Sequence, residues 1–164
     1  MTEVIKRDGN KEALNIEKLH KVVSFACENV AGVSASQVEL NSKIQFFDGI
    51  KTEDVQETLI KSAADLISEE TPNYQWVAGR LINYHLRKMV YGQFDPPHLH
   101  GIVVKNVERG FYDAEILSSF SKSEFNKLNS YIKHQRDDNL TYAAMEQFRG
   151  KYLVQNRVTK EIFE

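Results

Sequence analysis

Residues 4–18 read Val4-Ile5-Lys6-Arg7-Asp8-Gly9-Asn10-Lys11-Glu12-Ala13-Leu14-Asn15-Ile16-Glu17-Lys18, and this stretch decides how the chain begins to fold. Val4-Ile5 and Ala13-Leu14 are short apolar steps on either side of Asp8-Gly9, a dipeptide typical of hairpin turns because it tolerates positive φ. Asn15 has a side-chain oxygen that can accept a hydrogen bond from the first turn of a helix. The stretch therefore predicts a small β-hairpin that leads directly into a helix.

Basic side chains gather around this predicted helix start. They are Lys6, Arg7, Lys11 and Lys18. A helix N-terminus has unpaired N–H groups and a partial positive charge, so lysines beside it favour a bound phosphate. The pattern indicates an anion or nucleotide site. An ordinary hairpin with solvated surface lysines would give the same pattern.

The composition is that of an ordinary globular protein. The chain has 164 residues, of which 41% are hydrophobic and 27% are charged, so it has enough apolar material for a core. This length allows one ordinary domain, or one small domain and part of another. The formal net charge of −2 gives no overall field that would attract nucleic acid, so we expect no nucleic-acid partner.

The sequence has a single cysteine, Cys27. One thiol excludes an intramolecular disulfide, a CxxC redox pair and a four-cysteine zinc site, and it favours a reducing compartment. No apolar run approaches the roughly 20 residues that span a bilayer, and Met1-Thr2-Glu3 does not begin a signal peptide. The sequence therefore predicts a cytoplasmic protein with no membrane partner. His98 and His100 have no third ligand at a useful spacing, so we expect no metal site.

Two helices are predicted between the hairpin and residue 50. Apolar residues at spacings of three and four predict the first, from Ile16 to about Val30. Ser34 and Gln37 have the spacing of a capping box that would begin the second. The apolar positions of this second helix are Val38, Leu40 and Ile44. We expect it to end near Asp48-Gly49.

Two further helices are predicted before residue 92. Thr52 has the hydroxyl of an N-cap, and Glu53-Asp54 would place acidic side chains in the first turn, where the helix dipole favours them. Thr71-Pro72 is expected to begin the next helix, because proline suits the first helical position. That helix would run to about Tyr91, with Gly92 as the residue that ends it.

Asp95-Pro96-Pro97 is the best candidate for a domain boundary, because a residue before proline is disfavoured in the α region. Helices are predicted beyond it at about 97–109, 113–119, 121–132 and 141–149, the third of them begun by a capping box at Ser121–Glu124. Two strands are predicted at Tyr152–Val154 and Ile162–Phe163. A terminal hairpin with no further partner is marginal in water, so we expect the chain to be part of a larger protein.

Several stretches, taken together and in order, resemble a known family. Residues 4–9 and 15–19 resemble the opening of an ATP-cone, the regulatory module of ribonucleotide reductases. Three others are similar to the amino-terminal part of the large subunit of the class I, aerobic ribonucleoside-diphosphate reductase. They are Ile44-Gln45-Phe46-Phe47-Asp48-Gly49-Ile50-Lys51-Thr52, Tyr84-His85-Leu86-Arg87-Lys88 with Val90-Tyr91-Gly92-Gln93-Phe94, and Lys151-Tyr152-Leu153-Val154-Gln155-Asn156-Arg157.

The resemblance implies a mainly α fold with a small amount of β. Residues 2–92 would be the ATP-cone, a short β-hairpin capping a four-helix bundle. Residues 93–164 would be a helical lead-in and the first strands of an incomplete α/β barrel domain, the catalytic domain of the family. The implied ligand is ATP or dATP as an allosteric effector, with Mg²⁺ as an optional companion, and no redox cofactor is expected in this chain.

The resemblance also implies the residues of the effector site. They are Lys6, Arg7, Glu12, Ala13, Leu14, Asn15, Ile16, Glu17, Lys18, Thr52, Gln56, His85 and Lys88. Lys6 and Lys88, with Arg7 and His85, would neutralise phosphates. Glu12 and Asn15 would hydrogen-bond the base, and Ile16 would line its pocket. Lys18 and Thr52 would complete the polar rim.

Two features of the predicted helices affect this site. His85 and Lys88 are three residues apart, so they share one helix face, as a common phosphate site requires. Gln56 stands where relatives that respond strongly to dATP can carry histidine. Glutamine cannot become cationic, so it can offer a phosphate only a hydrogen bond. This departure weakens the expectation of dATP inhibition more than that of nucleotide binding.

The implied function is control of overall activity in the reduction of ribonucleoside diphosphates to deoxyribonucleotides for DNA synthesis. The implied partners are the remainder of the large subunit, the small radical-generating subunit and further copies of the complete large subunit. The reaction needs several active-site thiols, so this chain, with Cys27 alone, has no catalytic residue and should be inactive by itself.

Two alternatives remain open. Each describes a protein that is not part of a ribonucleotide reductase in the way described above. One is a free-standing nucleotide-sensing regulator, although a single cysteine cannot build the zinc ribbon of the bacterial repressor that carries such a cone. The other is a complementation piece that pairs with a separate carboxy-terminal chain and binds no nucleotide.

Overall fold

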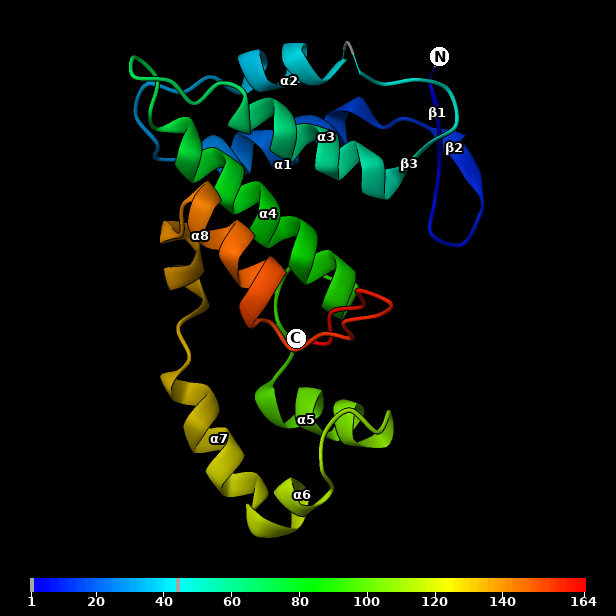
Figure 1. Cartoon of the computed structure of the whole chain (residues 1–164), viewed down its shortest axis with the longest axis vertical. Helices are drawn as coiled ribbons and strands as arrows, with labels where there is room; N and C mark the ends of the chain where they lie inside the picture. The colour runs from blue at the N-terminus through cyan, green and yellow to red at the C-terminus, as the bar shows by residue number, and fades with distance from the viewer. Residues whose placement is uncertain (1, 44) are drawn as a thin grey trace.

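Three short strands form a small sheet beside a mainly helical body (Figure 1). The computed structural model describes residues 2–43 and 45–164. Strands β1 (Glu3–Ile5) and β2 (Lys11–Ala13) pair antiparallel. The turn between them places Gly9 at φ +84°, a conformation that costs glycine little. The predicted hairpin is therefore confirmed.

The third strand, β3 (Ile50–Lys51), has no counterpart among the sequence predictions. It pairs parallel with β1, so that Ile5 lies opposite Lys51 and the sheet order is β2-β1-β3. Val4 and Ile50 lie opposite each other and are each only 2% exposed, so their burial in the core holds this pairing together. Because β3 runs straight into α3 (Thr52–Ala64), the pairing brings the N-terminus of α3 beside the Lys6-Arg7 turn.

Helices α1 (Ile16–Cys27) and α2 (Ala35–Lys43) are both shorter than predicted. The helix α1 ends at Cys27 and not near Val30, because Glu28 is already extended and Asn29 has a φ of 57°. The helix α2 ends at Lys43, before Asp48-Gly49. Ile44, which was expected on its apolar face, lies outside the described residues.

The predicted capping box at the start of α2 is wrong. The backbone N–H of Ser34 donates to the hydroxyl of Tyr74 over 2.9 Å, and that hydroxyl donates to the side-chain oxygen of Gln37 over 2.5 Å. A tyrosine from a distant helix thus takes the place of the local pair between Ser34 and Gln37.

The starts of α3 and α4 (Tyr74–Tyr91) are shifted from their predicted positions. Lys51 is the N-cap of α3, so Thr52 is the first helical residue and not the cap. Asn73 is the N-cap of α4, so Pro72 lies in the turn before that helix. The predicted end of α4 is confirmed: Gly92 has a φ of 74°, and its N–H donates to the carbonyl of Lys88.

The helix α4 lies at the centre of the core. It packs against α1 and α3 on one side and against α8 (Tyr142–Gln147) on another (Figure 1). Met145 of α8 belongs to the same hydrophobic cluster as the buried residues of α4. At Gly79, a built Cβ would lie 2.1 Å from the carbonyl oxygen of Leu140. Glycine is therefore needed where the chain before α8 crosses α4.

Three helices follow α4 and lie apart from the sheet (Figure 1). They are α5 (Leu99–Glu108), α6 (Glu115–Ser119) and α7 (Lys122–Tyr131). The capping box at the start of α7 is confirmed, since Ser121 and Glu124 each bond to the other's backbone. The helix α7 packs against α5.

The last part of the chain differs most from the prediction. A 3-10 helix, η1 (His134–Asn139), precedes α8, and a π-helix, η2 (Phe148–Tyr152), continues it past Gly150, which was expected to end it. The two predicted segments pair antiparallel, but neither forms a strand: within the described residues they meet in one bridge, between Gln155 and Ile162, and in a hydrogen bond from the Phe163 N–H to the Val154 carbonyl. None of the described helices is long and apolar enough to cross a membrane.

Candidate functional site

The hairpin carries an exposed ion pair next to its turn. The ammonium of Lys6 lies 2.8 Å from a carboxylate oxygen of Glu12, and both side chains are about half exposed. The hydrogen bond and charge of Glu12 raise the pKa of Lys6. Two predicted site residues thus lie together, and the lysine is positively charged at neutral pH.

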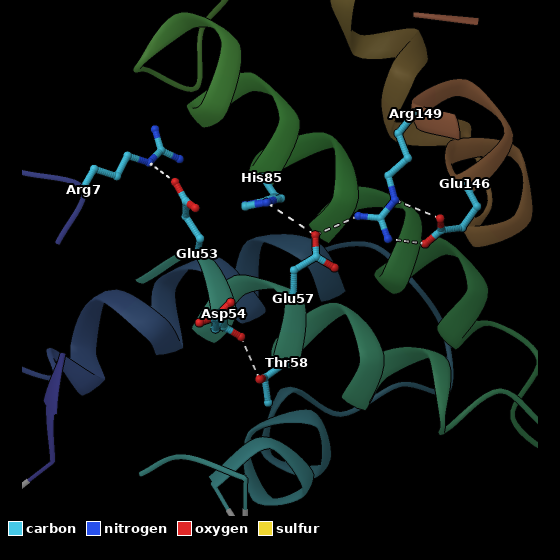
Figure 2. Close-up of polar contacts among 8 residues, drawn as sticks. All are labelled: Arg7, Glu53, Asp54, Glu57, Thr58, His85, Glu146 and Arg149. Carbon is cyan, nitrogen blue, oxygen red and sulfur yellow. Dashed lines mark hydrogen bonds and ion pairs between the residues drawn. The ribbon is translucent and has the colours of Figure 1, made fainter. Parts of the chain in front are cut away.

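Arg7 joins the hairpin to two helices. Its Nη1 donates to the backbone carbonyl of Lys88 on α4 over 2.9 Å. Its Nε lies 3.2 Å from a carboxylate oxygen of Glu53 on α3, as Figure 2 shows. Arg7 and Lys88, both predicted site residues, are therefore brought together from opposite ends of the first 92 residues.

His85 lies one turn before Lys88 on α4 and is only 5% exposed. Its Nε2 is 3.4 Å from the Glu57 carboxylate, while its Nδ1 is buried without a hydrogen-bond partner among the described residues. Burial lowers the pKa of His85, the nearby Glu57 carboxylate opposes this, and Arg7 and Arg149 lower it further. His85 is therefore mainly neutral at pH 7, and it offers a hydrogen bond more readily than the positive charge expected from the sequence.

The start of α1 confirms the predicted cap. The side-chain oxygen of Asn15 accepts from the backbone N–H of Lys18 over 2.8 Å. This leaves the amide NH₂ of Asn15 for other partners. Ile16 is 56% exposed and Leu14 is partly buried against the core, whereas Ala13, Glu17 and Lys18 are exposed.

The remaining predicted residues lie on α3. Thr52 follows β3, whose pairing with β1 places it beside the Lys6-Arg7 turn. Gln56 lies one turn further on the same helix face, and its side-chain oxygen is buried without a hydrogen-bond partner in the described chain. No hydrogen bond or ion pair within residues 2–43 and 45–164 joins the 13–18 stretch to Thr52, Gln56 or α4.

Four charged residues of this region were not predicted from the sequence. They are Glu53, Glu57, Glu146 and Arg149. The sequence predicts Glu53 only as an acid in the first turn of a helix. Its spacing of four residues from Glu57 places both carboxylates on one helix face, and this is the signal that the sequence offers. Glu146 and Arg149 have the i, i+3 spacing of a helical ion pair, but nothing local connects them to α3. The described residues contain no group of three or more His, Cys, Asp or Glu side chains that could hold a metal ion.

Comparison with known proteins identifies the family. Residues 2–89 match the ATP cone domain. The chain belongs to the ATP cone domain family. The match contains all of the predicted site residues, from the hairpin to Lys88 on α4.

The similarity to curated proteins extends beyond the ATP cone. The chain is 55% identical, over 98% of its length, to the ribonucleoside-diphosphate reductase 1 subunit alpha of Escherichia coli K12. It is 55% identical to the protein of the same name from Salmonella typhimurium and 53% identical to the ribonucleoside-diphosphate reductase subunit alpha of Buchnera aphidicola from Acyrthosiphon pisum. In each case it spans 21% of the relative's length.

Proposed function

We propose that residues 2–92 bind ATP or dATP, with Mg²⁺ as an optional companion, and that this binding regulates a ribonucleoside-diphosphate reductase. In this proposal a hairpin caps a bundle formed by α1 to α4. Residues 93–164 form the helical lead-in to the catalytic domain. The regulated reaction is the reduction of ribonucleoside diphosphates to deoxyribonucleotides.

The observation that carries this proposal is the contact of Arg7 with Lys88 and Glu53. It brings the basic turn of the hairpin to the start of α3 and to the last turns of α4. The parallel pairing of β1 with β3 supports the same convergence, because it sets the free N–H groups of the α3 N-terminus beside Lys6 and Arg7. Lysine and arginine side chains beside a helix N-terminus form the kind of site that binds phosphate groups.

The existing ion pairs are compatible with a phosphate ligand. Lys6 with Glu12 and Arg7 with Glu53 are exposed pairs, and solvent screens such pairs so that they contribute little to stability. A triphosphate offers more charge and more acceptor oxygens than either carboxylate, so it can replace them. Glu12 would then be released to accept from the base or ribose, and the NH₂ of Asn15 would reach the base.

The buried polar atoms also fit a ligand. Gln56 Oε1 and His85 Nδ1 are buried without protein partners in the described chain, an arrangement that costs free energy unless something pairs with them. Both belong to the predicted site. A bound nucleotide or the water it orders would supply the missing hydrogen bonds.

The proposal assigns regulation, not catalysis, to this part of the chain. Nucleotide binding would change how large subunits assemble with each other and with the small radical-generating subunit. Such coupling requires that the effector bind one assembly more tightly than another, and typical coupling free energies are about 1–3 kcal/mol.

Calorimetric titration of the chain with ATP and with dATP tests the proposal. We expect Lys6→Ala and Lys88→Ala each to weaken ATP binding by on the order of tenfold, since each removes a charge-assisted phosphate contact. Lys122→Ala, on the exposed start of α7, is the matched control and should leave the affinity unchanged. Unchanged ATP affinity in both site variants would overturn the site assignment. An absence of ATP binding to the unaltered chain would overturn the function.

A further inference from the structure

The carboxylate of Glu57 joins three parts of the chain. It projects from α3, and its Oε1 lies 3.4 Å from the Nε2 of His85 on α4. The same oxygen accepts a 2.8 Å hydrogen bond from the Nη1 of Arg149, which belongs to η2. Figure 2 shows both contacts meeting at this one oxygen atom. One oxygen of Glu57 therefore accepts a hydrogen bond from Arg149 and also lies close to the imidazole of His85.

Arg149 is held in a defined orientation. Its Nε and Nη2 donate to the two carboxylate oxygens of Glu146 over 2.8 and 2.6 Å, so all three guanidinium nitrogens are bound. Its backbone carbonyl accepts from the side-chain amide of Gln155. Arg149 lies where α8 passes into the π-helix η2. Short π-helical segments occur often at functional sites.

His85 stands between this cluster and the candidate nucleotide site. Figure 2 shows its ring between the Arg7–Glu53 pair and the Glu57 carboxylate. The charges that act on it come from both sides: Arg7 and Glu53 on one, and Glu57 and Arg149 on the other. An anion that binds Arg7 would therefore change the electrostatic potential at His85, which in turn contacts Glu57.

We propose that His85, Glu57 and Arg149 couple the candidate nucleotide site to the segment formed by α8 and η2. The inference rests on the proposed function. Polyphosphate at Arg7 favours a protonated His85, which takes a proton from solvent and forms a charge-assisted bond with Glu57. Because Glu57 Oε1 is shared, this bond competes with the one from Arg149, and the hold of α3 on η2 weakens.

Linkage makes the proposal testable through affinity. If the Arg149 bond to Glu57 opposes nucleotide binding, its removal must favour nucleotide binding by the same factor. We expect Arg149→Gln to tighten ATP binding by about fivefold or more, the lower range of typical allosteric coupling. Arg157→Gln is the matched control, because this arginine of the same terminal region donates to the carbonyl of Lys151 and does not contact Glu57.

A second variant, Glu57→Gln, tests whether the coupling passes through Glu57. With Glu57→Gln the shared carboxylate is replaced by a neutral amide of the same shape, so the competition for a charge is removed. Arg149→Gln added to Glu57→Gln should then change ATP affinity less than twofold. An equal tightening in both backgrounds would overturn the route through Glu57.

Hydrogen exchange tests the coupling on the unaltered chain, so this measurement does not depend on whether a variant folds. On addition of ATP we expect the amides of residues 148–153 to exchange faster, while those of the hairpin and the end of α4 exchange more slowly. If the unaltered chain binds no ATP, the proposed function fails. If it binds ATP but residues 148–153 show no faster exchange and Arg149→Gln matches Arg157→Gln, the coupling alone is overturned.

Discussion

The guanidinium of Arg7 donates a 2.9 Å hydrogen bond to the backbone carbonyl of Lys88, which lies 81 residues further along the chain. The same carbonyl accepts from the N–H of Gly92 at the end of α4. A helix C-terminus carries a partial negative charge, so the cation of Arg7 is favoured there. The hairpin is thereby docked on the last turn of α4, and a change in either element reaches the other.

Arg7→Gln should affect nucleotide binding more than stability. Arg7 and Glu53 are about half exposed, and the Lys88 carbonyl keeps its hydrogen bond from Gly92, so we expect the substitution to cost about 1 kcal/mol of unfolding free energy. Loss of a charge-assisted phosphate contact should weaken ATP binding by on the order of tenfold. Calorimetry and thermal unfolding measure the two effects. Arg136→Gln, at an exposed arginine of η1, is the control, and equal ATP affinities for the two variants would contradict the prediction.

His85 should make the chain less stable in mild acid. Its pKa is lowered from the ordinary 6.5 by burial in the fold, so the unfolded chain binds the proton more readily than the folded one. The contribution of neutral His85 is complete above pH 6.5 and is lost as the pH falls from there toward the lowered value. Urea unfolding between pH 7.5 and 5 should show a steeper loss of stability for the unaltered chain than for His85→Gln. Parallel pH profiles would refute this.

Gly79→Ala should destabilise the fold. A Cβ at this position would lie 2.1 Å from the Leu140 carbonyl oxygen, so α4 and the chain before α8 must separate. We expect a cost of about 1–3 kcal/mol, typical of overpacking. Gly101→Ala, within α5 and with nothing near its added methyl, should instead stabilise by up to about 1 kcal/mol, as alanine favours helix. Thermal unfolding of the two variants should therefore show shifts of opposite sign.

Arg80→Met should loosen the end of α1. The Nη1 of Arg80 donates to the carbonyls of Ala26 and Glu28, and its Nε donates to the carbonyl of Asp138. Methionine retains the apolar stem but leaves these acceptors without their donor, at a cost of about 1–3 kcal/mol. Chemical unfolding measures this loss. A stability equal to that of an Arg136→Met control would show that water replaces the arginine at no cost.

Interactions between near neighbours were predictable from the sequence. Asn15 caps α1, Gly92 ends α4 and Ser121 pairs with Glu124, each as expected. These hydrogen bonds close within about four residues, so side-chain chemistry and backbone preference decide them. The errors arose where a distant group competed, as when Tyr74 bound Gln37 and removed the expected capping box. The two segments predicted as strands near the end of the chain contain apolar residues, but in the described structure they pair through a single bridge and form no strand.

The same difference between local and long-range contacts applies to the candidate site. The sequence by itself determined which residues are cationic, where the helices carry them and that a hairpin precedes α1. Only the tertiary structure decided that β3 pairs with β1, that Arg7 reaches Lys88, that His85 is buried, and that Glu57 meets Arg149. The physical reason is that such contacts join residues far apart in the chain. They depend on how the buried faces of α3, α4 and α8 pack, which no local period or spacing encodes.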